Sequence, residues 1–203
     1  LLWTRPAAPD TPACAFAQEV ARDVEREALA LVQAEARIAA KDWDDDAEAS
    51  RKGMAEWINQ WLGGLESLRW AQMEKPLKAA PVGERPAYAR LASRGDAASW
   101  KTQWKTLREH AGVTPEQRRA PPRPGQALAP IEAILMGQGK LELSAKWSTA
   151  LAQADQAMAA VDPARAATVL SASTALKSLS LLFQNEVASS LDIPLGFSSA
   201  DGD

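Results

Sequence analysis

The acidic side chains of this chain are the ones best suited to bind a metal ion. Two aspartates, Asp201 and Asp203, close the chain in the stretch LGFSSADGD. A second acidic group lies in DWDDDAEAS and comprises Asp42, Asp44, Asp45, Asp46 and Glu48. Carboxylate oxygens are the usual ligands of hard cations, but the internal group lacks the glycine and the regular spacing of a calcium loop. For that group we favour a solvated turn that also caps the following helix.

The single histidine and the single cysteine limit the chemistry that this sequence supports. His110 has the chemistry of a metal ligand or an acid–base group, but it lies near the predicted end of a helix, where a partly charged imidazole is favoured by the helix dipole. We therefore favour a structural role for it. Cys14 alone forms neither an internal disulfide nor a cysteine-based zinc site. One histidine also leaves no basis for a Ser/His/Asp set, and we assign no catalytic residue.

Eight tryptophans raise the alternative of a ligand-binding box lined by indole rings. Trp57 and Trp61 are four residues apart, as are Trp100 and Trp104, so each pair lies on one face of a helix. Both pairs fall on apolar stripes, and we expect all four rings in the core. The tryptophans that lie off these stripes are Trp3, Trp43 and Trp70.

The overall composition indicates a folded protein without a nucleic-acid partner. Of the 203 residues, 46% are hydrophobic and 24% are charged, which are values typical of globular chains. The net charge is −3 and no block of lysine or arginine stands out, so we expect no binding to nucleic acid. No run of about 18 apolar residues occurs, and we expect no transmembrane segment in this chain.

Helical periodicity dominates the sequence. Thr11 is the predicted N-cap of a first helix, with Pro12 in its first turn, and Asp96 is the predicted cap of a later one. The other helices are expected over residues 47–72, 97–111, 131–136, from about 142 to 161, and in a last stretch that includes 169–187. The segment MEKPLKAAPVGERPAY, residues 73–88, contains three prolines and is predicted to be a connection.

The last helix carries the pattern of a bundle seam. Its apolar residues alternate at spacings of three and four, and they are Val169, Ala172, Leu176, Leu179, Phe183 and Val187. No stretch shows sustained alternation with β-branched residues. We therefore predict an all-α fold of antiparallel helices with a proline-rich crossing loop. The linker 112–127, which includes TPEQRRAPPRPGQ, is a candidate sub-boundary.

Four stretches resemble the imelysin family of bacterial envelope proteins. The C-terminal ALKSLSLLFQNEVASSLDIPLGFSSADGD resembles the family's final helix and its closing LGF…DGD. CAFAQEVARDVEREALALVQ is similar to a family helix that begins Cys-Ala-aromatic, and WINQWLGGLESLRWAQMEKPL is similar to a GLxxLRxxKxxKPL helix and turn. RLASRGDAASWKTQWKTL loosely resembles a Ser/Arg/Gly turn leading into a helix. The resemblance covers residues 1–203 as a C-terminal portion of such a protein.

The resemblance implies an N-terminal segment before Leu1. In the family a GxHxxE motif precedes a tyrosine and apolar residues, to which LLW is similar. The motif, the first helices and a signal peptide or lipoprotein anchor are then expected upstream. The family fold is two helical bundles with the motif near their interface, located in the periplasm or anchored to an envelope membrane. We also expect Leu1, Leu2 and Trp3 to need a partner surface.

The resemblance implies uptake or binding of iron or another metal, with iron or zinc held together with residues upstream of Leu1. One alternative is a zinc-type metallopeptidase that uses the upstream motif, and another is a non-catalytic helical interaction module. The expected partners are the missing N-terminal segment and an iron-uptake component of the envelope. If the tail docks against the helices, Asp201 and Asp203 become candidate carboxylate donors to a metal, although an Asp-Gly turn explains them as well. Arg94 is our candidate for the basic side chain that offsets their charge.

Overall fold

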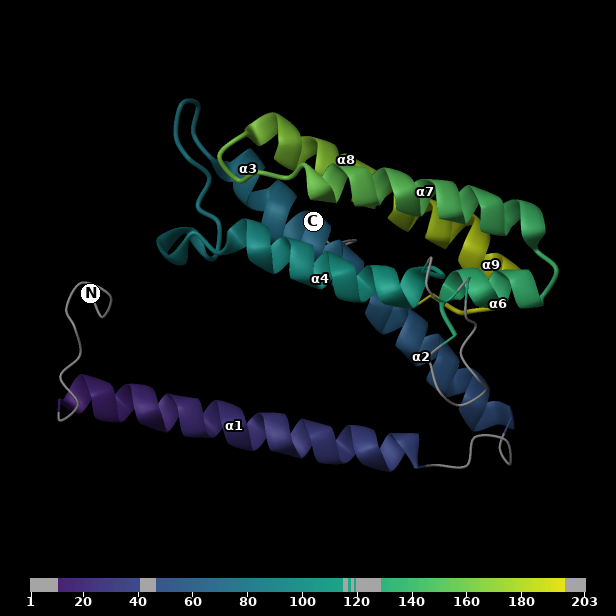
Figure 1. Ribbon diagram of the computed structural model, residues 1–203, viewed down its shortest axis with the longest axis horizontal. Coiled ribbons are helices and arrows are strands. Elements are labelled where there is room, and N and C mark those ends of the chain that lie inside the picture. Colours follow the sequence, from purple (N-terminus) through teal and green to yellow (C-terminus); the bar gives the residue numbers. More distant parts are fainter. Residues whose placement is uncertain (1–10, 41–46, 115–116, 118, 120–128, 196–203) are drawn as a thin grey trace. The chain divides into compact units, whose positions relative to one another are not determined.

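The computed structural model of the chain describes residues 11–40, 47–114, 117, 119 and 129–195 (Figure 1). These residues form helices joined by turns, and none of them lies in a strand. The predicted all-α class is therefore confirmed. The chain divides into two compact units, Leu1–Arg51 and Lys52–Asp203.

The first unit contains helix α1, Pro12–Ala39. Its N-terminus forms as predicted, because the Thr11 side chain accepts a hydrogen bond from the Cys14 backbone N–H at 3.3 Å. Pro12 occupies the first turn, where a missing N–H costs no helical hydrogen bond. Trp3, Trp43 and the aspartates of the acidic group lie outside the described residues.

The second helix continues through part of the segment predicted as a connection. Helix α2, Ala47–Glu66, runs directly into the π-helix η1, Ser67–Glu74, and then into α3, Lys75–Ala79. The predicted helix end near Gln72 is therefore wrong. The connection proper begins only after Ala79.

The π-helix explains how a helix accommodates Pro76. A proline inside a regular α-helix lacks its N–H and clashes with the carbonyl four residues earlier. In η1 the Lys75 N–H instead bonds to the Trp70 carbonyl, five residues back. This wider turn gives the Pro76 ring more room, and π-turns of this kind recur as single bulges within α-helices.

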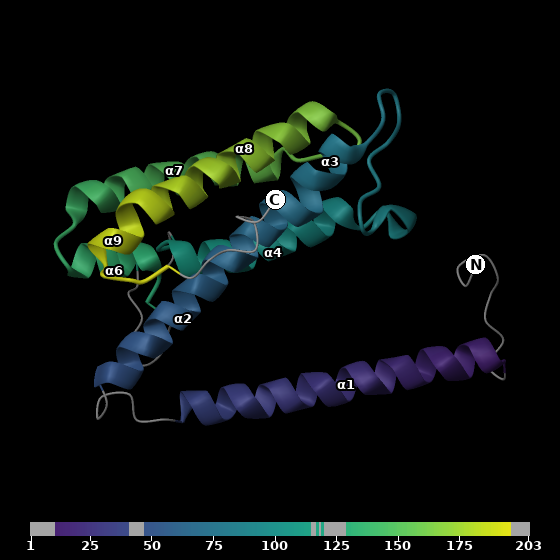
Figure 2. The same cartoon turned by 180° about the vertical axis from the view of Figure 1, so that it is seen from behind.

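Further helices of the described ranges complete a bundle in the second unit. They are η2, Leu91–Ser93; α4, Asp96–Ala111; α6, Ile131–Gly137; α7, Leu141–Ala159; α8, Ala166–Leu182; η3, Phe183–Val187; and α9, Ala188–Ser190. α7 and α8 pack side by side with a short loop between them, and α8 also contacts η1 (Figures 1 and 2). Most of the linker 112–127 lies outside the described residues.

The core follows the predicted seam. All six seam residues of the last helix, between Val169 and Val187, are fully buried. Trp61, Trp100 and Trp104 are buried, so their predicted core placement is confirmed. Trp57 is only partly buried and packs against the edge of this core. Trp147 joins them, and its indole N–H donates to the Ala111 carbonyl at 2.8 Å. Buried indoles normally need such a partner.

The chain after α9 turns back onto α2. The Asn59 side chain donates a hydrogen bond to the Pro194 carbonyl at 3.0 Å, across 135 residues of sequence. Ile193 also packs against the core. The predicted docking of LGFSSADGD concerns residues 195–203, and those after Leu195 lie outside the described part of the chain. Residues 1–3, for which a partner surface was predicted, also lie outside it.

One helical stretch of the described chain, Ala166–Ser190, is long and apolar enough to cross a membrane by length and composition alone. It consists of α8, η3 and α9, and its buried side chains form the bundle seam. Core helices of globular proteins pass the same test. The expectation of no transmembrane segment stays a prediction.

Candidate functional site

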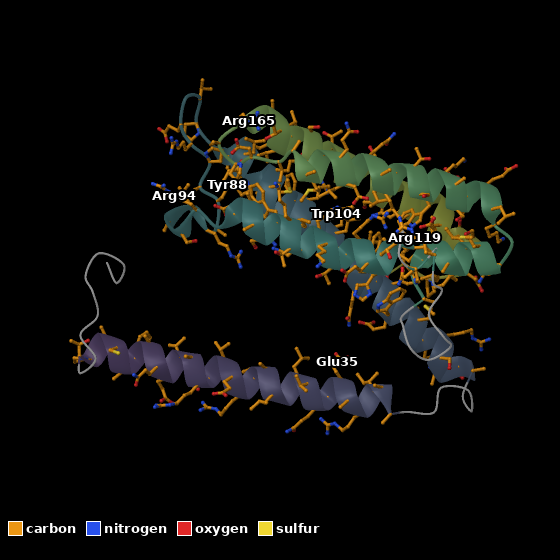
Figure 3. All side chains as sticks on the ribbon, viewed as in Figure 1. Glu35, Tyr88, Arg94, Trp104, Arg119 and Arg165 are labelled. Atoms are coloured by element: carbon orange, nitrogen blue, oxygen red, sulfur yellow. The ribbon has the colours of Figure 1, made fainter. Side chains whose placement is uncertain are left out.

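Two loops at one end of the second unit enclose a pocket of about 670 Å³. The α3–α4 connection contributes residues 84–86, 88, 91 and 94, and the start of α4 contributes 96 and 97. The α7–α8 connection contributes residues 162–164, followed by Ala166 at the start of α8. Figure 3 shows Tyr88, Arg94 and Arg165 together at this end of the bundle. We call this cavity the loop pocket.

The α3–α4 connection is fixed by its own backbone hydrogen bonds. Arg94 adopts a left-handed conformation (φ 55°) and its N–H donates to the Leu91 carbonyl. The Asp96 side chain accepts a hydrogen bond from the Arg90 N–H at 2.8 Å. Asp96 was predicted as the N-cap of α4, but Gly95 occupies that position. The Asp96 carboxylate instead closes the preceding turn through its hydrogen bond with the Arg90 N–H.

Tyr88 forms the inner wall of the loop pocket. Its side chain is 5% exposed, and its ring meets Trp100 edge-on with the centroids 4.9 Å apart. Burial, and to a lesser extent the nearby Asp96 charge, raises the pKa of the Tyr88 hydroxyl above its ordinary value. The hydroxyl therefore stays protonated and remains a hydrogen-bond donor. Within the described residues it has no hydrogen-bond partner.

The two aspartates that line the pocket accept hydrogen bonds from other residues. Asp96 is bound to the Arg90 N–H, and Asp162 accepts hydrogen bonds from the Ala164 N–H and the Arg165 side chain, both at 2.9 Å. The backbone hydrogen bond from Ala164, followed by the Arg165 side chain, lowers the pKa of Asp162. Arg85 and Arg94 also line the pocket.

A second polar feature lies inside the bundle, where η1 faces α8. The Arg69 guanidinium donates to Glu66 at 2.5 and 3.2 Å and to Glu74 at 2.8 Å. The three side chains are only 10–11% exposed. From α8, Ser173 donates to Glu74 at 3.0 Å and Ser180 donates to Glu66. We call Glu66, Arg69 and Glu74 the ion cluster.

The ion cluster is charge-balanced by a residue on its rim. The Lys78 ammonium lies 2.6 Å from Glu74, so two carboxylates face two cations. Desolvation raises the pKa of Glu74, but the hydrogen bonds from Lys78 and Ser173 and the charges of Lys78 and Arg69 outweigh it, so that its pKa lies below the ordinary value. Every carboxylate of the cluster has a protein partner, which is the arrangement of a structural network rather than of a ligand site.

The predicted site residues have different outcomes. Arg94 lines the loop pocket, whereas Asp201 and Asp203 lie outside the described residues, so the pairing of Arg94 with them stays a prediction. His110 packs against Trp57 with the ring centroids 5.7 Å apart. Among the residues that the structure describes, no group of three or more His, Cys, Asp or Glu side chains is placed to hold a metal ion.

Sequence reasoning missed Tyr88 and Arg85. Both lie in the segment predicted as a mere connection, and the signal that marks them is weak: Tyr88 is the single tyrosine of the chain, in a proline-rich loop. No known protein family matches this chain. Searches of curated proteins and of solved structures likewise found no significant match. The residues themselves must therefore carry any functional argument.

Proposed function

We propose that this chain is the C-terminal portion of an imelysin-like envelope protein that takes part in the acquisition of iron or another metal. The proposal is supported by hydrogen bonds between two of the stretches that resemble the family. Glu66 and Asn59 belong to WINQWLGGLESLRWAQMEKPL, and they bond to Ser180 and Pro194 of the C-terminal stretch. Those contacts join residues 114 and 135 positions apart.

Such contacts are expected if the stretches belong to one family fold. In this proposal the resembling stretches form the scaffold, and the metal-binding groups come from elsewhere. They are the His and Glu of the upstream GxHxxE motif, with Asp201 and Asp203 as candidate carboxylate donors.

The described residues alone do not fit a metal site. In the described ranges no three His, Cys, Asp or Glu side chains are grouped to hold a metal ion, and the ion cluster carboxylates are bound to Arg69 and to serines. A hydrolytic metal site needs about three protein ligands and an open position. The metal-linked proposal therefore depends on residues outside the described part of the chain, and its test must include them.

The test uses the protein with its upstream sequence included. We expect a GxHxxE motif before Leu1, about one bound metal ion per chain by elemental analysis, and no cleavage of casein or of a peptide library. Metal-dependent cleavage would establish the peptidase alternative. A protein that binds neither iron nor zinc would refute the metal-linked proposal and favour the alternative of a non-catalytic interaction module.

A tail deletion then tests the role of the last residues. Removing the residues after Pro194 should lower both the melting temperature and the metal content if the tail docks and the terminal aspartates contribute to the site. The matched control replaces Asp201 and Asp203 by asparagine, which retains the tail but removes its two side-chain charges. Unchanged metal content and unchanged melting temperature in the deletion would show that the tail is dispensable.

A further inference from the structure

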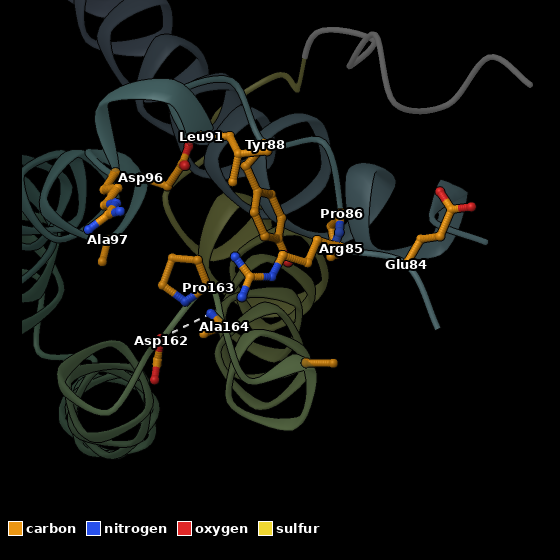
Figure 4. A pocket seen from close by; sticks show the side chains of 12 residues that line it. Glu84, Arg85, Pro86, Tyr88, Leu91, Asp96, Ala97, Asp162, Pro163 and Ala164 are labelled. Atoms are coloured by element: carbon orange, nitrogen blue, oxygen red, sulfur yellow. Dashed lines mark hydrogen bonds between the residues drawn. The ribbon is translucent and has the colours of Figure 1, made fainter. Parts of the chain in front are cut away.

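The Tyr88 hydroxyl is the starting point of a second, independent argument. A buried hydroxyl without a partner is unfavourable, and such groups are uncommon in folded proteins. The Tyr88 side chain is 5% exposed, and its hydroxyl has no partner among the described residues. Figure 4 shows its ring extending into the loop pocket towards Arg85 and Pro163. Because the hydroxyl oxygen itself is covered, a ligand that moves the neighbouring side chains aside would supply the missing acceptor.

Two exposed arginines line the same pocket as this donor. Arg85 and Arg94 both line the pocket, and no hydrogen bond or ion pair joins either guanidinium to another residue of the described ranges. The pocket aspartates keep their charge but bond to other residues: Asp96 accepts from the Arg90 N–H, and Asp162 accepts from the Ala164 N–H and the Arg165 side chain. The third carboxylate, Glu84, points away from the Tyr88 ring (Figure 4).

The backbone at Arg94 also points to a role beyond folding. A left-handed conformation is common for glycine and asparagine and unfavourable for other side chains. Arg94 nevertheless adopts it at φ 55°, at the rim of the pocket. Arg94 is the C-cap residue of η2, a position where glycine is the usual residue in the left-handed conformation. Strained positions of this kind cluster at ligand-binding sites.

We propose that the loop pocket binds the oxyanion group of a small molecule, a carboxylate or a phosphate, through the Arg85 and Arg94 guanidinium groups and the Tyr88 hydroxyl. Guanidinium groups match the planar geometry of carboxylate and phosphate oxygens. The pocket is large enough, at about 670 Å³, for a ligand of metabolite size. Pro86, Leu91 and Pro163 provide apolar walls for the remainder of that ligand.

Calorimetric titration of the whole protein with citrate and with inorganic phosphate tests this proposal. We expect at least one of the two to bind with a dissociation constant below about 1 mM. The probe that binds identifies the oxyanion class, since citrate carries carboxylates alone. Tyr88→Phe removes the hydroxyl with almost no change of shape and should weaken binding by roughly 10–100-fold, the range for a hydrogen bond to a charged group.

The arginine variants and their control complete the experiment. Arg94→Asn removes the guanidinium but suits the left-handed backbone, so the protein should fold and bind at least about tenfold more weakly. Arg85→Gln should have a similar effect. Lys105→Gln removes one positive charge from an exposed site on α4 that does not line the pocket, and its affinity should stay within about twofold. Binding of neither probe, or equal losses in Lys105→Gln and Arg94→Asn, would overturn the proposal.

Discussion

Replacing Arg69 by methionine should destabilise the bundle more than any surface charge change. The Arg69 side chain is 11% exposed and its guanidinium contacts Glu66 and Glu74 at 2.5 and 2.8 Å. Its removal leaves two buried carboxylates with one remaining cation, the Lys78 ammonium, whose side chain is 62% exposed. Breaking a buried ion pair in this way costs about 3–5 kcal/mol. For a chain of this size that corresponds to a fall in melting temperature of roughly 6–20 °C.

A second variant separates charge imbalance from lost packing. Arg69→Met combined with Glu66→Gln removes one cation and one anion, and leaves the Glu74–Lys78 pair intact. An amide at position 66 still accepts the hydrogen bond from Ser180. The double variant should therefore recover half or more of the stability that the single variant loses, because an uncompensated buried charge is the main cost of breaking such a pair.

Urea unfolding followed by tryptophan fluorescence measures these differences. The control is Lys146→Met on α7, which breaks the Lys146–Glu186 pair at 2.9 Å, where the two side chains are 62% and 45% exposed. An exposed pair is worth about 0–1 kcal/mol. The reasoning would be refuted if Arg69→Met cost no more than this control, or if the double variant were less stable than the single one.

Four further outcomes follow from the described contacts. Because the pKa of Glu74 is lowered, its contribution to stability should be complete above pH 4.5 and lost as the pH falls further, and Glu74→Gln should flatten this acid dependence in pH-dependent urea titrations. Gly112→Ala should cost about 1–3 kcal/mol in urea unfolding through overpacking, since a Cβ there would lie 2.4 and 2.6 Å from two neighbouring side chains. Gly63→Ala, with no atom within 4 Å, should stabilise by up to about 1 kcal/mol. Trp100→Ala should lower the free energy of unfolding by about 3–5 kcal/mol.

The helices and the core could be predicted because their signals are local. The spacing of Val169 to Val187 defines a seam whatever it packs against, and the two tryptophan pairs at spacing four lie on apolar stripes for the same reason. The N-cap at Thr11 is also a local signal, since its hydrogen bond spans three residues. Each of these predictions needed only the helical period.

The π-helix and the loop pocket could not be predicted because they depend on other information. A proline normally argues for a helix end, and only the Lys75–Trp70 hydrogen bond, which no residue pattern reveals, shows that the helix continues. The loop pocket requires that residues 84–97 and 162–166 meet, and this depends on how α4 packs on α7. The Tyr88 hydroxyl becomes informative only when its burial is known.

The environments of Arg69 and Arg94 predict different effects of mutation, on stability for Arg69 and on ligand binding for Arg94. Arg69 is buried and its guanidinium is bound to two carboxylates, so its interaction energy is already used within the fold. Arg94 lies at the pocket rim, where no described residue pairs with it, and it occupies a backbone conformation that favours other residues. Changes at Arg69 should therefore alter the free energy of unfolding, and changes at Arg94 should leave it unchanged or raise it slightly. If Arg94→Asn loses oxyanion affinity but keeps its stability, the ligand-binding site of this bundle is the loop pocket and not the ion cluster.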